Sequence, residues 1–270
     1  MWDSAAFSSI FLASAFSCSQ TLSTPAHTQV TQTVGQFLAK QVGQMQNEIS
    51  EYIDVCNKNT KRAISSFLVG DKTKQIAQET FLFYFGEKSQ PFQKYYVENI
   101  GNREVFLSAS NYFRIFKQRY SLQGIDGNFL DKLEKEKTKI LNYIDDGRLA
   151  DLYFEFFAFA QLQHGEKTVS KNLGSFFAKL VHTFCPDRYC ALDNPIKNYL
   201  GLERESFYLA FIIVSNAYQE WIKENPVLVQ DIRDELERNL SAKPYSGKMT
   251  NLKLLDMIFW YQTNVVLKNG

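Results

Sequence analysis

Apolar residues recur at intervals of three and four along most of the chain, and this is the spacing of one face of an α-helix. The longest stripe predicts a helix over residues 30–53 and consists of Val30, Val34, Phe37, Leu38, Val42, Met45, Ile49, Tyr52 and Ile53. Similar patterns predict helices over 71–85, 110–120, 131–145, 149–162, 170–184, 207–224, 227–240 and 252–266, and Pro91 opens a further segment. No long stretch alternates with period two, so we predict an all-α fold of many helices.

Turn-forming residues divide the predicted helices into two lobes. The run Gly124–Gly127 marks a seam, so we expect an amino-terminal helical lobe over residues 27–125 and a second lobe over residues 126–270. Residues 1–26 form an apolar leader or a packed amino-terminal segment. Its stretch Ala5–Phe16 imitates a secretion signal, but no basic residue precedes Lys40 and Asp3 stands where such a signal carries positive charge.

Composition and charge narrow the function classes. The 270 residues are 45% hydrophobic, which excludes a disordered chain. The formal net charge is +1, so binding to nucleic acid through bulk charge is excluded, whereas a local basic face is not. The longest clean apolar run, Phe207–Val214, is far shorter than the roughly 20 residues of a membrane-spanning helix. We therefore expect no membrane association.

Cysteine and histidine residues are few and scattered. The four cysteines include no C-x-x-C pair, and the sequence has only three histidines. This pattern predicts neither a structural zinc site nor an iron–sulfur cluster, and it is typical of a reducing cytoplasmic location. We expect a monomer that uses no metal and no other cofactor.

One segment, residues 170–202, combines a helix, a loop and a second helix start. Pro195 suits the first turn of the new helix, so Asp193 is predicted as its N-cap, with the carboxylate accepting backbone N–H bonds. Spacing alone favours a purely structural cap.

The residues around Asp193 resemble a known family. The stretch Ala191–Leu200, ALDNPIKNYL, is similar to the catalytic-aspartate segment of the helix-hairpin-helix DNA glycosylases. The upstream AKLVH and CPDRY of residues 178–189 resemble the S-K-x-L-H-F-x-x-P-D-x-F pattern of bacterial proteins with an 8-oxoguanine-glycosylase-like fold. The carboxy-terminal LLDMIFW, residues 254–260, is similar to a D-x-x-L-W helix of the same proteins. The resemblance covers about residues 170–202 and 250–262.

The resemblance implies particular roles. Asp193 takes the place of the catalytic aspartate, and either Lys171 or Lys179 takes the place of the lysine nucleophile of lyase members; Lys171 suits the start of the preceding helix, and Lys179 suits the local pattern. The glycine-rich hairpin that grips a DNA phosphate in the family is missing here. Its place holds residues 164–169, so phosphate binding falls to side chains such as Lys167.

Two further features are candidates for contact with DNA. Trp260 is the candidate for the base pocket, with Phe259 and Tyr261 as alternatives, since aromatic side chains stack on an extruded base. The 110–120 helix interleaves aromatic and basic residues, and Arg114, Lys117 and Arg119 are candidates for phosphate contacts. An amphipathic helix with snorkelling cations explains the same pattern.

The expected function is therefore a DNA glycosylase-like enzyme. It would flip a modified base out of double-stranded DNA and cleave its N-glycosidic bond, in base-excision repair or in antiviral defence against modified phage DNA. The alternative is a catalytically inactive all-α module that binds DNA or protein. A third hypothesis is a helical effector in which the leader is a genuine export signal.

Overall fold

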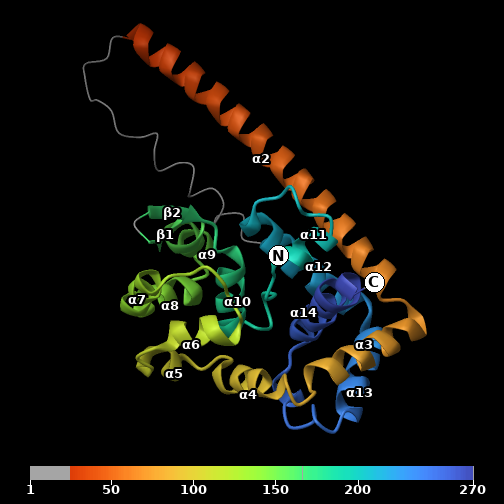
Figure 1. The fold of residues 1–270 in the computed structure, drawn as a ribbon. Helices are drawn as coiled ribbons and strands as arrows, with labels where there is room; N and C mark the ends of the chain where they lie inside the picture. The colour runs from red at the N-terminus through yellow and green to blue at the C-terminus, as the bar shows by residue number, and fades with distance from the viewer. Residues whose placement is uncertain (1–24, 166, 270) are drawn as a thin grey trace. The chain divides into compact units, whose positions relative to one another are not determined.

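A computed structural model describes residues 25–165 and 167–269. The all-α fold predicted from the sequence is confirmed, because the described residues form helices α2 to α15 and a single two-stranded sheet (Figure 1). Residues 1–24 of the predicted leader lie outside the described residues, so the export-signal hypothesis stays a prediction.

The chain divides into two compact units, Met1–Tyr52 and Ile53–Gly270. The described part of the first unit belongs to α2 (Pro25–Phe67), which confirms a long helix where the 30–53 stripe predicted one. Within this unit the apolar side chains of Met45 and Ile49 are exposed.

The second unit holds the remaining elements. Its α-helices are α3 (Gly70–Tyr84), α4 (Gln90–Asn99), α5 (Arg103–Ser108), α6 (Tyr112–Arg119), α7 (Gly127–Lys135), α8 (Lys137–Asp145), α9 (Leu149–Leu152), α10 (Gly174–Phe184), α11 (Asn194–Tyr199), α12 (Phe207–Glu224), α13 (Pro226–Arg238), α14 (Asn251–Tyr261) and α15 (Leu267–Asn269). Short π-helical turns cover Tyr153–Phe157 and Gln262–Val266, and a 3-10 turn covers Ser246–Lys248. The strands are β1 (Ala160–His164) and β2 (Lys167–Lys171).

Several helix starts follow from local capping chemistry. The side chains of Asp126, Ser206 and Thr250 each accept a hydrogen bond from a backbone N–H in the first turn, of α7, α12 and α14 respectively. Pro91 lies in the first turn of α4 and Pro226 in that of α13, where a missing N–H costs no hydrogen bond.

The prediction of a helix over residues 149–162 is wrong for the second half of this range. The chain leaves the π-helical turn at Phe157 and enters β1, which pairs antiparallel with β2 from Ala160↔Lys171 to His164↔Lys167. The uniform apolar run suggested a fully buried helix, yet Phe154 and Phe159 are 54% and 71% exposed. The helix predicted to start at residue 170 begins only at Gly174 for the same reason, because the intervening residues complete the β-hairpin.

The single helix predicted over residues 131–145 is two helices, α7 and α8, which meet at Glu136. The apolar positions named by the pattern are nevertheless buried: Leu133, Ile140, Leu141 and Ile144. The helical period was therefore sufficient to identify the core-facing side, although it did not reveal the break.

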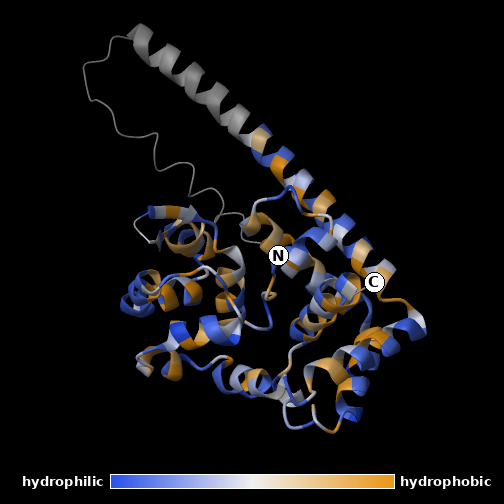
Figure 2. Cartoon of the chain, in the orientation of Figure 1, coloured by the Kyte–Doolittle hydropathy of each residue, from blue (hydrophilic) through white to orange (hydrophobic). Residues whose placement is uncertain are grey.

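One hydrophobic core runs through the second unit, from Ile64 to Phe259. Helix α3 packs against α13 and α14, α10 against α12, and α6 against α7. The boundary predicted between residues 125 and 126 lies inside this unit, and the residues on both of its sides contribute to the same core. Figure 2 shows hydrophobic and hydrophilic positions interspersed along individual helices, as expected for helices with one buried face.

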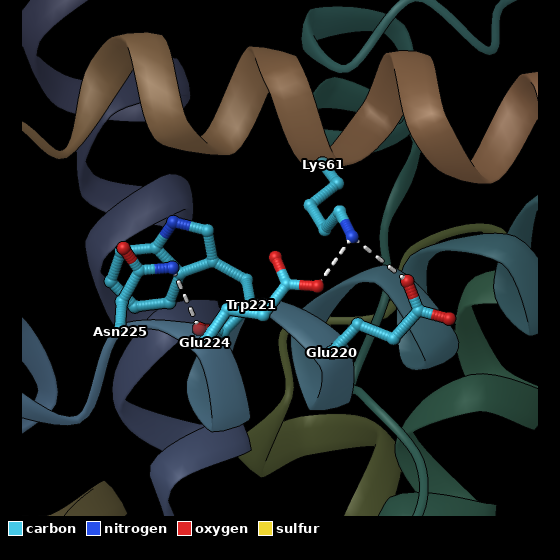
Figure 3. A network of polar contacts seen from close by, with 5 residues as sticks. All are labelled: Lys61, Glu220, Trp221, Glu224 and Asn225. Carbon is cyan, nitrogen blue, oxygen red and sulfur yellow. Dashed lines mark hydrogen bonds and ion pairs between the residues drawn. The ribbon is translucent and has the colours of Figure 1, made fainter.

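The last turns of α2 are tied to α12 by an ion-pair network (Figure 3). The Nζ atom of Lys61 lies 2.7 Å from a carboxylate oxygen of Glu224 and 3.3 Å from one of Glu220. On the same helix Trp221 is completely buried, and the Asn225 side-chain amide donates to the Trp221 carbonyl oxygen at 2.9 Å. Both carboxylates of the network are about half exposed, so the ion pairs contribute little to stability.

The starts of α10 and α12 approach so closely that one position requires glycine. A Cβ atom added to Gly174 would lie 2.2 Å from Cγ of Phe207, a buried ring. We expect Gly174→Ala to lower the free energy of unfolding by roughly 1–3 kcal/mol through overpacking. The matched control is Gly247→Ala, because a Cβ there meets nothing within 4 Å. Denaturant unfolding of both variants checks this, and equal losses would contradict the close approach.

Candidate active site

A cavity of about 530 Å³ lies within the second unit and gathers residues from α3, α4, α6, α10, α11 and α14. Its walls are aromatic and include Tyr84, Phe92, Tyr120 and Trp260. The ring centroids of Trp260 and Tyr84 lie 5.8 Å apart, and those of Phe92 and Tyr120 lie 5.1 Å apart. An aromatic-walled cavity of this volume is suited to a planar ligand of nucleotide size.

Helix α14 presents one face to the cavity. Lys253, Asp256, Met257 and Trp260 all line it, and their spacing of three and four residues places them on the same side of the helix. Thr250 caps this helix, and the Thr250 hydroxyl also donates to the Pro186 carbonyl oxygen at 3.0 Å, which fixes the start of α14 against the loop after α10.

Lys179 reaches the same cavity from α10. It is 9% exposed, and its Nζ atom donates to the Ser175 hydroxyl at 2.6 Å. Burial lowers the pKa of Lys179, while the negative charges of Asp193 and Asp256 act in the opposite direction. A lowered pKa raises the fraction of neutral amine, which is the nucleophilic form.

Lys253 and Asp256 are two further buried ionisable residues that line the cavity. The Lys253 ammonium lies over the rings of Tyr96 and Phe92, at 4.7 and 5.5 Å from their centroids, and burial lowers its pKa. Burial raises the pKa of Asp256, so its neutral form is favoured. Oδ2 of Asp256 accepts the Ala191 N–H at 2.5 Å, whereas Oδ1 is buried and has no hydrogen-bond partner among the described residues.

Asp193 is the N-cap of α11, as the sequence predicts. Its Oδ1 accepts the Ile196 N–H at 3.1 Å. The side chain is buried and is not among the residues that line the cavity, although Ala191 and Ile196 on either side of it are. Its negative charge still acts on Lys179. The structure therefore places Asp193 behind the cavity wall, close enough to influence the lysine electrostatically.

His182 lies on α10 one turn beyond Lys179 and is completely buried. Its Nδ1 is 2.7 Å from the Tyr189 carbonyl oxygen, to which it donates, so its Nε2 accepts from the Tyr96 hydroxyl at 2.9 Å. Burial, together with the charges of Lys253 and Lys179, lowers the pKa of His182 to about 3. The imidazole is therefore neutral and serves to link α10 to α4.

The three predicted basic residues of α6 lie in different environments. Of the basic residues of α6, Arg119 lines the cavity, Arg114 pairs with Asp131 at 2.8 Å, and Lys117 donates to the Ile125 carbonyl oxygen at 2.7 Å. The inward packing predicted for the aromatic residues of α6 is confirmed, since Tyr112, Phe113 and Phe116 are buried.

The predicted residues of β2 do not reach the cavity. Lys167 and Lys171 are both exposed on the strand, and the Lys171 ammonium lies 3.4 Å from the Gln123 carbonyl oxygen. In place of a glycine-rich turn between helices, residues 160–171 form the β-hairpin. Trp260 lines the cavity while its neighbour Phe259 is fully buried in the core.

The cavity residues that were missed from the sequence as site candidates include Gln93, Lys253 and Asp256. Asp256 stands inside the quoted LLDMIFW motif, and its spacing from Trp260 places both on one helical face. That spacing was a usable signal for Asp256 and Lys253. No local pattern distinguishes Gln93 from any other polar residue of a helix.

No family model, curated protein or solved structure matches this chain. None of the helices in the described part of the chain is both long enough and apolar enough to cross a membrane. The functional argument therefore depends on the residues of the cavity.

Proposed function

We propose that this protein is a DNA glycosylase-like enzyme that accepts a modified base, extruded from double-stranded DNA, in the cavity between α4, α10 and α14. The observation that carries the proposal is that Lys179, Trp260 and Arg119 line one cavity. The sequence suggested these three for separate reasons: a nucleophile, a stacking surface and a phosphate contact.

The side chains around the cavity suit the successive steps of base excision. Extrusion of a base costs a few kcal/mol, and stacking on aromatic side chains such as Trp260 and Tyr84 returns roughly 1–3 kcal/mol. The Lys179 amine then attacks C1′ of the deoxyribose, the C1′–N bond breaks, and its electron pair leaves with the base. The resulting adduct becomes a Schiff base, and water releases it as an abasic site.

The charge around the cavity favours a polyanion. It is lined by four basic residues, Lys88, Arg119, Lys179 and Lys253, and by one acidic residue, Asp256. Lys88 and Arg119 are exposed. Gln118 and Ser121 line this cavity and also a neighbouring one of about 360 Å³ that contains Arg114 and Lys117. A local basic tract of this kind supports binding to phosphates although the net charge of the chain is only +1.

Duplex oligonucleotides carrying a panel of modified bases test the proposal. Wild-type protein should produce alkali-labile sites with at least one base, and borohydride should trap a covalent protein–DNA adduct. Lys179→Gln should abolish trapping. Lys171→Gln is the matched control, because Lys171 is exposed on β2, and it should retain the adduct.

A third variant, Asp193→Asn, distinguishes the role of Asp193 as a helix cap from the effect of its negative charge. Asp193→Asn keeps an oxygen that accepts the Ile196 N–H, so the fold should survive while the charge acting on Lys179 is lost. A wild type that binds duplex DNA but releases no base across the panel would refute the enzyme and favour the inactive binding module. Trapping that survives Lys179→Gln would refute the assignment of the nucleophile.

A further inference from the structure

Two residues that line the cavity have buried polar atoms that none of the described residues satisfies. Oδ1 of Asp256 and both side-chain amide atoms of Gln93 are buried without hydrogen-bond partners among the described residues. Both residues line the cavity, and Gln93 is completely inaccessible to solvent. Buried polar atoms without partners cost roughly 1–3 kcal/mol each, so their presence in one cavity indicates a ligand that completes them.

Contacts of neighbouring residues connect the two helices that carry Gln93 and Asp256. Lys253, one turn before Asp256 on α14, stacks over Phe92 and Tyr96, which flank Gln93 on α4. The other oxygen of Asp256 is fixed by the Ala191 N–H. The free oxygen is therefore presented by a carboxyl group that cannot turn away without losing that bond.

We propose that Asp256 is the acid that protonates the departing base, while the Gln93 amide binds the donor and acceptor groups on the edge of that base. This inference rests on the proposed function. A neutral base leaves the sugar as an anion unless it receives a proton, so an acid positioned at its edge lowers the barrier.

The proton that Asp256 gives to the base is replaced by a proton from Lys179, so the transfer needs no other group. As the bond from Lys179 Nζ to C1′ forms and the C1′–N bond breaks, the Asp256 carboxyl transfers its proton to the base, which leaves neutral. The carboxylate then takes a proton from the secondary ammonium on Lys179 and returns to its acid form. Burial raises the pKa of Asp256 to about 7, so a part of the carboxyl groups carries the required proton near neutral pH.

Other ionisable groups act on Asp256 and must be considered in any pH profile. The charged ones are Lys179 on α10, Asp193 before α11 and Lys253 on α14. Five neutral side chains also interact electrostatically with Asp256, whose negative charge raises their pKa values: Tyr84, Tyr96, Tyr120, Cys190 and Tyr218. Burial raises the pKa of each of these five groups, so they stay protonated where the acid titrates.

The test is the single-turnover rate as a function of pH, with a duplex carrying a neutral modified base from the panel. The wild-type profile should be bell-shaped, because the reaction needs a neutral amine and a protonated acid. Asp256→Asn should lower the maximal rate roughly 100-fold or more and remove the alkaline decline, while Asp256→Glu should restore part of both. Asparagine can still accept the Ala191 N–H, so the fold is preserved.

Two comparisons make the result decisive. A duplex carrying 7-methylguanine, whose base is already cationic and leaves without a proton, should lose at most about threefold with Asp256→Asn. Gln93→Leu should weaken substrate binding but keep the alkaline decline. Equal losses on both bases, or an unchanged pH profile in Asp256→Asn, would overturn the acid role alone. A wild type that excises no base would overturn the proposed function and this role together.

Discussion

Replacing Trp221 by alanine should lower the free energy of unfolding by roughly 3–5 kcal/mol. Trp221 lies in the last turns of α12, next to Glu220 in the chain, and its side chain has no exposed surface. Removal of the indole leaves a cavity that the surrounding helices cannot fill, and the loss is of the same order as the total stability of many domains. Urea or guanidinium unfolding followed by circular dichroism measures the difference.

Trp221→Phe is the matched control for this prediction. The indole N–H is buried without a partner among the described residues, so replacing the indole by a phenyl ring removes volume but no hydrogen bond. We expect Trp221→Phe to retain most of the stability that Trp221→Ala loses. Similar losses in the two variants would indicate that the N–H group, rather than the packed volume, matters at this position.

Lowering the pH from 6.5 to 5 should cost the wild-type protein about 2 kcal/mol through His182 alone. The pKa of this imidazole is lowered from 6.5 to about 3 by burial. The unfolded chain therefore binds the proton first as the pH falls, and the stability that is fully present above pH 6.5 is lost progressively toward pH 3. The measurement is the free energy of unfolding at pH 6.5 and pH 5.

His182→Gln isolates this contribution. Glutamine has a donor for the Tyr189 carbonyl oxygen and an acceptor for the Tyr96 hydroxyl, but it does not titrate. Asp256 has the opposite effect on the pH dependence of stability, because its raised pKa makes the fold less stable as the pH rises. Asp256 is present in both proteins, so its contribution cancels in the comparison. The variant should therefore lose about 2 kcal/mol less than the wild type between pH 6.5 and pH 5. Identical pH dependence would contradict a buried neutral imidazole.

Helices whose ends are marked by a capping residue or a proline were predictable from the sequence. The helix predicted over residues 207–224 has those bounds in the structure, because a serine cap precedes it and Pro226 follows it. Asp193 was predicted as an N-cap from Pro195 alone, and it is one. In both places the local capping chemistry agrees with the tertiary structure.

The β-hairpin could not be predicted, because residues 149–162 are nearly all apolar along both the helix and the strand. A run of this kind does not distinguish a buried helix from a helix followed by a strand. The pairing partner that stabilises β1 is supplied by residues 167–171, which contain a single apolar residue and therefore show no alternation.

The cavity was predictable only in part. Trp260, Lys179 and Arg119 were chosen from short motifs, and the fold brings them to one place. Gln93 belongs to the cavity because α4 packs beside α14 through Lys253, which is a contact between residues far apart in the chain. Sequence patterns predict the buried face of each helix, but they do not predict which helices pack against each other.

The β-hairpin also affects how copies of this protein meet. No third strand joins β1 and β2 within the described residues, and all five residues of β2 are exposed, so β2 keeps one backbone edge open to another chain. On β1 the Gln163 N–H donates to the Asp126 carboxylate. Lys167 and Lys171 stand at the two ends of β2 and give this ribbon a positive charge. Because like charges repel, the two lysines oppose edge-to-edge pairing of two copies and so protect the protein against self-association at high concentration.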